Sequence, residues 1–477
     1  MVFVEGTKES IQGALAVFDI FAEWSGLMIS IAKSTLYLAG VSETETNNIL
    51  SNFPFAKGDL PVRYLGLPLM TKVMRKQDYF PLVEKIRGRI STWTTRFLSF
   101  GGRLQLIKAV IMSVVNFWST VYLLPSKCIK EIEHLCEAFL WTGPELKATG
   151  AKVAWSVICQ TNKEGGLGIR DLKVVNRVNV LKLIWRLFSS KSLWGRWIEV
   201  NLLKKKCFWE IKEKTQMGSW MWRKMLKTRD IARRFHKREL GNGVLVSLLG
   251  ERGIVSLGIR REATLEEAVM CVRRRRSHRS QLLNEVETQL VLAKEKLRDG
   301  VEDGNIWKRR SGYKKEFSTH ETWSQMRTLG ESCSWSKAVW FSQATPKYAF
   351  MTWLAVRDKL STMDRVSKWR QGADEIWECQ TSGILLSAQT NVWSEVLAII
   401  MDESLEKKKR FCLRYAFQAT IHAVWIERNK IKHEVKPLLI ATVMKLVEKG
   451  IRNKLSILRS RGVKGWEDGL QYWFTRT

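Results

Sequence analysis

The stretch Phe80–Trp93, FPLVEKIRGRISTW, decides the fold class of this chain of 477 residues. Its apolar residues recur every three or four positions, at Val83, Ile86, Ile90 and Trp93. Because an α-helix turns once in about 3.6 residues, this spacing places them on one helical face. The helical pattern continues to Trp141, and the pair Gly101-Gly102 predicts a break within it.

The start of the chain combines a helix with a short β element. Apolar spacing predicts a helix over Ser10–Ser25, and Gly26 follows it as a stop signal. Residues then alternate in polarity over Ile29–Leu38, which predicts a hairpin that turns at Lys33-Ser34.

Later segments are again helical. Asn176–Phe188 (NRVNVLKLIWRLF) and Lys407–Lys432 carry apolar residues at helical spacing, whereas Glu164–Gly168 (EGGLG) predicts a turn. Residues 195–315 are more polar and contain several loop signals. The expected fold class is therefore mainly α with small β hairpins (α+β).

The charge balance points to a polyanionic partner. Lys and Arg number 79 against 47 Asp and Glu, which gives a formal net charge of +32. Nucleic acid is the commonest large anion in cells, while anionic lipid and solubility alone are the alternatives. The 8 cysteines are scattered, so neither a disulfide framework nor a metal-binding knuckle is written in their spacing, and an intracellular location is expected.

A membrane partner is not expected. Ala109–Ser126 lacks charged residues and just reaches the length of a membrane-spanning helix. It also contains Asn116 and Pro125, and lysines flank both of its ends, so a buried helix is the better interpretation. The first residues, Met1–Glu5, show no secretory signal.

Several short strings together resemble the region that follows the palm in plant LINE-type (non-LTR retrotransposon) reverse transcriptases. In chain order these strings are Glu23–Leu27 (EWSGL), Thr35–Gly40 (TLYLAG), Arg63–Leu69 (RYLGLPL), Leu98–Arg103 (LSFGGR), Leu106–Lys108 (LIK), Phe139–Gly143 (FLWTG), Glu164–Leu172 (EGGLGIRDL) and Lys182–Arg186 (KLIWR). A later group, with Trp340-Phe341, Pro346-Lys347, Trp353-Leu354 and Arg357-Asp358, resembles the entry to a reverse transcriptase zinc-binding domain. Arg414–Ala419 and Trp425–Asn429 are similar to its usual continuation.

The resemblance implies five segments. They are a palm-end remnant with its hairpin (1–75), a helical thumb-like region (76–195), a polar and basic connection (196–315), a truncated zinc-binding-like domain (316–380) and a C-terminal helical region (381–477). The last two form a Trp-rich helical C-terminal part.

The catalytic carboxylates that the resemblance implies are missing. Polymerases hold two metal ions with carboxylates, and in this family an adjacent Asp pair precedes a segment like Val2–Gly6. No Asp-Asp pair occurs in the sequence, so we expect no catalytic residues, no cofactor, no small-molecule substrate and no RNA-directed DNA polymerase activity. Arg357 and Asp358 are expected to be ion-paired surface residues.

The zinc ligands of the resembling domain are also incomplete. A structural zinc site needs four closely spaced thiolate or imidazole ligands. Cys379 is followed by Gln380 and Thr381 rather than by a second cysteine at the family's spacing, and no histidine lies nearby. His422 lies on an apolar helical face, where a core histidine is the simpler interpretation. We expect no metal site.

Basic clusters interleave with aromatic residues, which is the pattern of proteins that hold unpaired nucleic acid. The clusters are Lys204–Trp209 (KKKCFW), Trp220–Lys224 (WMWRK), Arg233–Arg238 (RRFHKR) and Lys407–Phe411 (KKKRF). The candidate nucleic-acid-binding residues are Lys204, Lys205, Lys206, Arg233, Arg234, Arg273, Arg274, Arg275 and Arg276. The alternative is that the rings are core and the cations are solvated.

Two classes of function follow. The first is a noncatalytic reverse transcriptase fragment that binds RNA or single-stranded DNA without sequence preference. The second is an inert, pseudogene-like product or a protein-interaction module. The run Arg273–Arg276 also fits a nuclear localisation signal, which would make the intracellular location nuclear.

Overall fold

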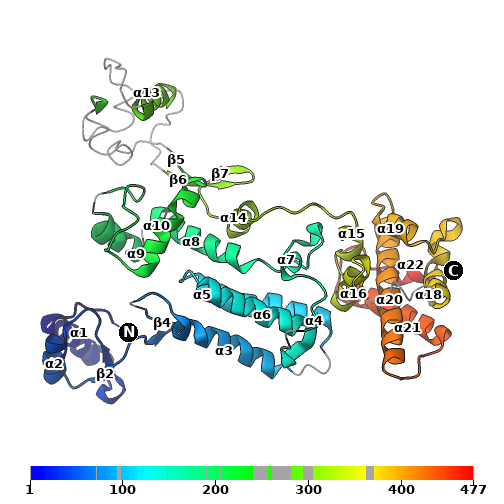
Figure 1. Cartoon of the computed structure of the whole chain (residues 1–477), viewed down its shortest axis with the longest axis horizontal. Coiled ribbons are helices and arrows are strands. Elements are labelled where there is room, and N and C mark those ends of the chain that lie inside the picture. Colours follow the sequence, from blue (N-terminus) through cyan, green and yellow to red (C-terminus); the bar gives the residue numbers. More distant parts are fainter. Residues whose placement is uncertain are drawn as a thin grey trace. The chain divides into compact units, whose positions relative to one another are not determined.

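The computed structural model describes residues 2–70, 72–93, 98–147, 149–189, 192–204, 206–239, 256–259, 281–293, 304–360 and 370–475. The described chain is mainly helical with small sheets, which confirms the expected fold class (Figure 1). Its contacts divide it into unit 1 (Met1–Leu82, Phe117–Cys128 and Asn176–Met326) and unit 2 (Val83–Asn116, Ile129–Val175 and Arg327–Thr477). This division leaves the five segments expected from the sequence as a prediction.

Unit 1 begins with the expected helix. Helix α1 spans Lys8–Ser25, and the Thr7 side chain caps it by accepting the N–H of Ser10. Gly26 ends the helix with a φ of 70°, a left-handed conformation that a residue without Cβ adopts freely. The predicted helix and its stop signal are both confirmed.

The hairpin predicted over Ile29–Leu38 is wrong. Residues Ile31–Lys33 form a 3-10 turn, and strand β1 (Thr35–Tyr37) pairs in parallel with β2 (Ala56–Gly58). Helix α2 (Glu43–Asn52) provides the crossover that parallel pairing requires, and Ser42 starts it with a capping box. A true hairpin lies just after, between β3 (Arg63–Tyr64) and β4 (Leu67–Pro68).

The core of unit 1 is aromatic and surrounds Trp307. Helices α8 (Leu172–Ser189) and α10 (Trp220–Arg233) contribute Trp185 and Trp222 to it. The Trp307 indole N–H donates to the Thr322 hydroxyl at 2.9 Å, so the buried donor is satisfied. The observed α8 confirms the helix predicted over Asn176–Phe188.

A three-stranded antiparallel sheet carries Trp307. Its order is β5 (His236–Glu239), β6 (Gly304–Arg309) and β7 (Gly312–Lys314). The other described elements of unit 1 are α9 (Leu193–Ile198), the π-turn η6 (Glu199–Leu203), α13 (Gln281–Ala293) and α14 (Thr319–Met326).

Helices α3 (Lys76–Thr92), α5 (Met112–Ser119), α6 (Ser126–Thr142) and α8 contribute residues to both units. The helix expected over Ala109–Ser126 is shorter than predicted, because α5 ends at Ser119 and follows a π-turn at Ile107–Ile111. Val115 and Trp118 are buried, whereas Phe117 is exposed, so the helix is only partly buried.

The break predicted at Gly101-Gly102 is wrong. Both glycines lie inside α4 (Phe100–Leu106), which Ser99 caps. A Cβ on Gly101 would lie 2.6 Å from the carbonyl group of Pro346, at the start of α16 (Pro346–Val356). Gly101 therefore permits close approach of two helices within unit 2.

The turn Glu164–Gly168 accepts hydrogen bonds from Trp353 and Arg357, which are distant in the sequence. The Gly165 carbonyl accepts the indole N–H of Trp353 at 2.7 Å and an N–H of Arg357 at 2.7 Å. Arg357 was expected in a surface ion pair; this expectation is wrong, because its guanidinium is half-buried against Trp335 and Trp353 and bonds a backbone carbonyl.

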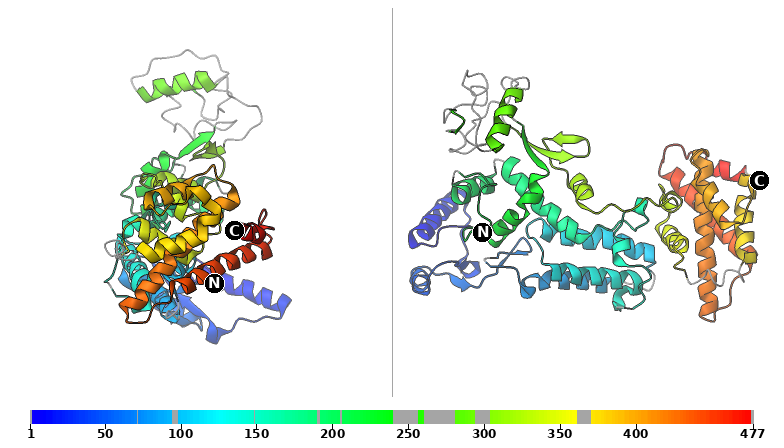
Figure 2. Two further views of the ribbon diagram at one scale, coloured as in Figure 1. Left: turned by 90° about the vertical axis from the view of Figure 1, so that its right-hand side faces the viewer. Right: turned by 45° about the horizontal axis from the view of Figure 1, so that its top comes forward.

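The C-terminal part of unit 2 is a helical bundle around α20 (Figures 1 and 2). Helix α20 spans Lys407–Lys432, as the sequence predicts. Around it lie α18 (Arg370–Leu385), α19 (Trp393–Met401), α21 (Ile440–Ser460) and α22 (Gly469–Phe474). Unit 2 also contains the short helices α7 (Trp155–Ile158) and α15 (Ser336–Val339).

No single helix of the described chain is long and apolar enough to cross a membrane. One bent pair, Asp374–Ala388 with Trp393–Met401, passes that test on length and composition alone. Residues of this pair, including Trp377 and Ile400, lie in the buried core of the bundle.

Candidate nucleic-acid interface

A stripe of exposed tryptophans lies on α9 of unit 1. Trp194 and Trp197 are 40% and 54% exposed, and their spacing places them on the same side of the helix. Val200 continues the stripe, and exposed Lys204 ends the segment with its N–H bonded to the Glu199 carbonyl. Two exposed rings thus precede an exposed cation in the chain.

A second group forms around Trp209. The guanidinium of Arg233 lies 5.4 Å from the Trp209 ring centroid, which is a cation–π distance. Phe188 stacks on Trp209 at 5.4 Å, and His236 lies 5.4 Å from the same ring. The structure therefore brings the Lys204–Trp209 and Arg233–Arg238 clusters of the sequence together at one place.

The outward face of the small sheet forms a third group. Lys237 Nζ lies 4.6 Å from the Tyr313 ring centroid, and Lys308 pairs directly with Tyr313 across β6 and β7. Side chains alternate along a strand, so Trp307, next to Lys308, faces the opposite side and enters the core. The exposed face thus carries two lysines beside a half-buried tyrosine ring.

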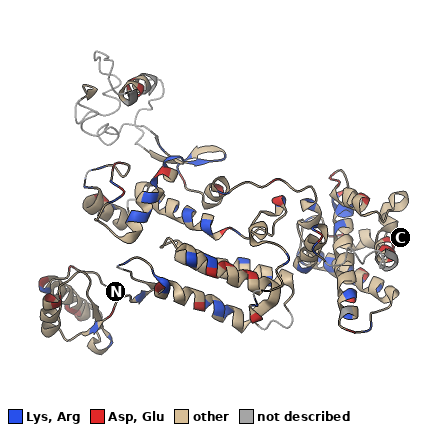
Figure 3. Cartoon of the chain, in the orientation of Figure 1, with Lys and Arg blue, Asp and Glu red and all other residues tan. Residues whose placement is uncertain are grey.

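Four of the predicted site residues lie in the described part of unit 1. Lys204, Lys206, Arg233 and Arg234 are exposed. None of the four takes part in an ion pair with another residue that the structure describes. Figure 3 shows Lys and Arg positions along α8 and α10 and on the sheet. Lys205 and Arg273, Arg274, Arg275 and Arg276 lie outside the described residues.

The rings of the basic clusters divide between core and surface. Phe208, Trp222, Phe235 and Phe411 are buried, as the alternative interpretation has it. In the cluster Lys407–Phe411, Lys408 forms an ion pair with Asp468 at 2.7 Å. Only part of the aromatic content can therefore meet a ligand.

Sequence reasoning missed Trp194, Trp197 and Tyr313. The first two carry a signal that could have found them: the string Trp194-Gly-Arg-Trp197 places a cation between two rings three residues apart. Tyr313 carries no such signal, because its neighbours Lys237 and Lys308 come from two other strands.

The segment that resembles a zinc-binding domain does not offer a zinc site among the described residues. Cys379 is exposed on α18, while Cys333 is half-buried and donates its backbone N–H to the Lys163 carbonyl. No group of three or more His, Cys, Asp or Glu side chains that could hold a metal ion occurs within the described ranges. These residues do not fit four-coordinate zinc.

Comparison with known proteins finds similarity over parts of the chain. Residues 317–383 match the family described as zinc-binding in reverse transcriptase. A protein of Arabidopsis thaliana that bears the name of a ribonuclease H protein is 37% identical over 159 residues. The match covers 32% of this chain and 25% of that protein, so the chain spans about a quarter of the relative's length. Together these similarities support a retrotransposon-derived origin.

Proposed function

We propose that this chain is a noncatalytic reverse transcriptase fragment of a plant LINE-type element, and that its unit 1 binds RNA and single-stranded DNA without sequence preference. The observation that carries the proposal is the exposed pair Trp194 and Trp197 on α9, which the π-turn η6 connects to the exposed Lys204. Exposed indole rings are costly in water, and an unpaired base stacking on them removes apolar surface from it.

The charges supply the second half of the mechanism. Lysine and arginine side chains contact phosphates and release bound counterions, which gives affinity that does not depend on sequence. Arg233 and Lys237 each lie against an aromatic ring, so a phosphate and a base of one strand can bind side by side. An intracellular location, nuclear if the Arg273–Arg276 run is a localisation signal, belongs to the same proposal.

A filter-binding titration of the purified chain with oligo-dT and oligo-U tests this function. Affinity should fall steeply between low and physiological salt, with a log–log slope of about −0.7 per phosphate contacted. The double variant Arg233→Gln/Arg234→Gln should weaken both ligands about equally. The matched control is Lys445→Gln/Lys449→Gln, two exposed lysines on α21 of unit 2.

Replacement of Trp194 and Trp197 by leucine should weaken binding without reducing the salt slope, because stacking releases no counterions. Absence of binding at low salt, or salt-independent binding to one sequence only, would overturn the proposal.

The absence of catalysis is part of the proposal and has its own assay. Two-metal phosphoryl transfer needs clustered carboxylates, and the sequence has no adjacent Asp pair. We expect no primer extension with magnesium or manganese, and no cleavage of the RNA strand of an RNA–DNA hybrid. Either activity above a mock-purified control contradicts this part.

A protein-interaction function is the alternative, and one observation favours it. Trp24 and Met28, at the end of α1, are 85% and 87% exposed. Such a surface is typical of protein contacts. Self-association that Trp24→Ser abolishes, in a chain that binds no nucleic acid, would support this second function.

A further inference from the structure

We infer that a cavity of unit 2 binds one nucleotide through its phosphate and its base. The cavity measures about 190 Å³ and is lined by Leu98, Ser99, Phe100, Arg103, Lys347, Met351, His422 and Trp425. Drug-sized ligands occupy cavities of roughly 300–1,000 Å³, so this one encloses only part of a nucleotide, and the rest of the ligand lies outside it. The cavity belongs to unit 2, and the inference does not depend on strand binding by unit 1.

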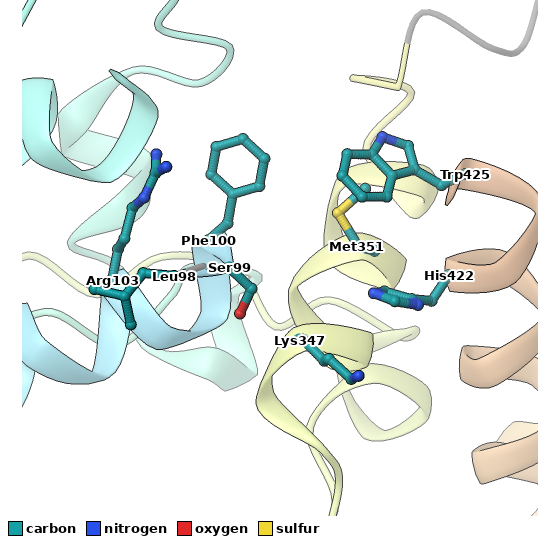
Figure 4. Close-up of a pocket in the computed structure, with 8 residues that line it drawn as sticks. All are labelled: Leu98, Ser99, Phe100, Arg103, Lys347, Met351, His422 and Trp425. Carbon is teal, nitrogen blue, oxygen red and sulfur yellow. The ribbon is translucent and has the colours of Figure 1, made fainter. Parts of the chain in front are cut away.

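The two walls of the cavity are aromatic. Figure 4 shows Phe100 of α4 on one side and Trp425 and His422 of α20 on the other, with Lys347 and Met351 of α16 between them. The Phe100 ring already stacks on Phe350 and has Arg103 over it, so a planar guest stacks on the half-buried Trp425 indole, and such stacking is worth about 1–3 kcal/mol per nucleobase.

The charge of the lining selects an anion. It contains two cations, Arg103 and Lys347, and no carboxylate. Lys347 is exposed, and it is the second residue of α16, where the helix dipole also favours negative charge. The Lys347 Nζ lies 5.1 Å from the centroid of the Tyr348 ring. Its N–H donors can therefore bond a phosphate.

Arg103 lines the cavity beside Phe100, and the protein itself holds its guanidinium. Its Nη1 donates to the carbonyls of Leu140 and Trp141, and its guanidinium lies 5.3 Å from the Phe100 ring centroid. Its Nε is buried and has no hydrogen-bond partner among the described residues. The cation therefore adds positive potential without needing to contact the ligand.

Two neutral groups can read the rest of the ligand. The Ser99 oxygen already accepts the Gly102 N–H at 3.2 Å, which leaves its hydroxyl hydrogen as a donor. Burial, followed by the charge of Lys347, lowers the pKa of His422 to about 4. Its ring is thus neutral at pH 7 and offers one donor and one acceptor to a base edge.

Isothermal titration of the whole chain with adenosine 5′-monophosphate, adenosine and inorganic phosphate tests the site. The monophosphate should bind more tightly than either part alone, because the cavity recognises both. Lys347→Glu should weaken the monophosphate roughly tenfold or more, since it replaces a charge-assisted hydrogen bond by repulsion. Lys445→Glu, the same charge change on exposed α21, should leave it unchanged.

Trp425→Leu should weaken adenosine and monophosphate together, and Lys347→Gln provides a milder variant should Lys347→Glu misfold. Arg233→Gln/Arg234→Gln should not change nucleotide affinity, which separates this site from the strand-binding surface. The inference is overturned if the monophosphate does not bind, or if the Lys347 variants bind it as tightly as the unchanged chain does.

A strand end and a free nucleotide share this chemistry. A 5′-phosphorylated trinucleotide that binds more tightly than its 5′-hydroxyl form identifies a strand end as the occupant. A monophosphate that binds while both trinucleotides fail identifies a free nucleotide. Both results support the cavity as a phosphate-and-base site.

Discussion

Glu164 joins distant parts of unit 2 through its hydrogen bonds. Both carboxylate oxygens contact Arg327, at 2.6 and 2.8 Å, and they also accept hydrogen bonds from Thr161 and the Gly330 N–H. Burial alone would raise the pKa of Glu164, but these hydrogen bonds outweigh it and lower the pKa to about 2. The carboxylate therefore stays charged in a nearly closed site.

Replacement of Glu164 by glutamine should destabilise the chain by roughly 3–5 kcal/mol, because it leaves the partly buried Arg327 without its charge partner. Urea unfolding at pH 7 measures the loss. Glu448→Gln breaks the exposed pair with Arg452 and should cost less than about 0.5 kcal/mol. If both variants lose the same unfolding free energy, the buried pair stabilises the chain no more than the exposed pair does.

His422 should make stability depend on pH. Its folded pKa of about 4 lies below the ordinary value of 6.5, so between these values the unfolded chain binds the extra proton. Stability is therefore lost as pH falls, by roughly 2 kcal/mol from pH 7 to pH 5. The variant His422→Gln should lose correspondingly less than wild type in denaturant titrations at both pH values; an identical pH response in the two proteins contradicts the assignment.

At the scale of elements, local pattern predicted helices well and contacts between elements poorly. The helices α1, α8 and α20 follow from apolar spacing within each segment. The parallel pairing of β1 with β2 depends on the crossover α2, which no alternation within β1 reveals. The candidate interface was half predictable for the same reason: basic clusters are visible in sequence, whereas exposure of Trp194 depends on packing elsewhere.

The same contrast appears in two helical glycines. Gly101→Ala should destabilise the chain by about 1–3 kcal/mol, because the added Cβ would lie 2.6 Å from the backbone of Pro346. Gly88→Ala, in α3, meets nothing within 4 Å and should stabilise it by about 0.5–1 kcal/mol. Thermal unfolding of both variants checks the pair. A stabilised Gly101 variant would show that α4 and α16 can separate.

At the scale of the molecule, charge should control stability. A formal net charge of +32 makes the folded chain repel itself. We expect the thermal midpoint to rise with added sodium chloride, and to rise further at low salt with oligo-dT, which binds the folded state. Uncharged polymer of similar size provides the control. A thermal midpoint that changes with neither salt nor oligo-dT would contradict this prediction. It would show that the surplus positive charge neither destabilises the folded chain nor binds oligo-dT.

Two hydrogen bonds described above also limit which recombinants can fold. Arg327 donates to Glu164, and Trp353 donates to the Gly165 carbonyl. A genetic exchange with a breakpoint between positions 166 and 326 would bring the turn from one parent and its partners from the other. Unless both parents carried matching residues, the recombinant would inherit an unmatched buried ion and would fold poorly. These two distant stretches are therefore expected to pass from copy to copy as a single hereditary block.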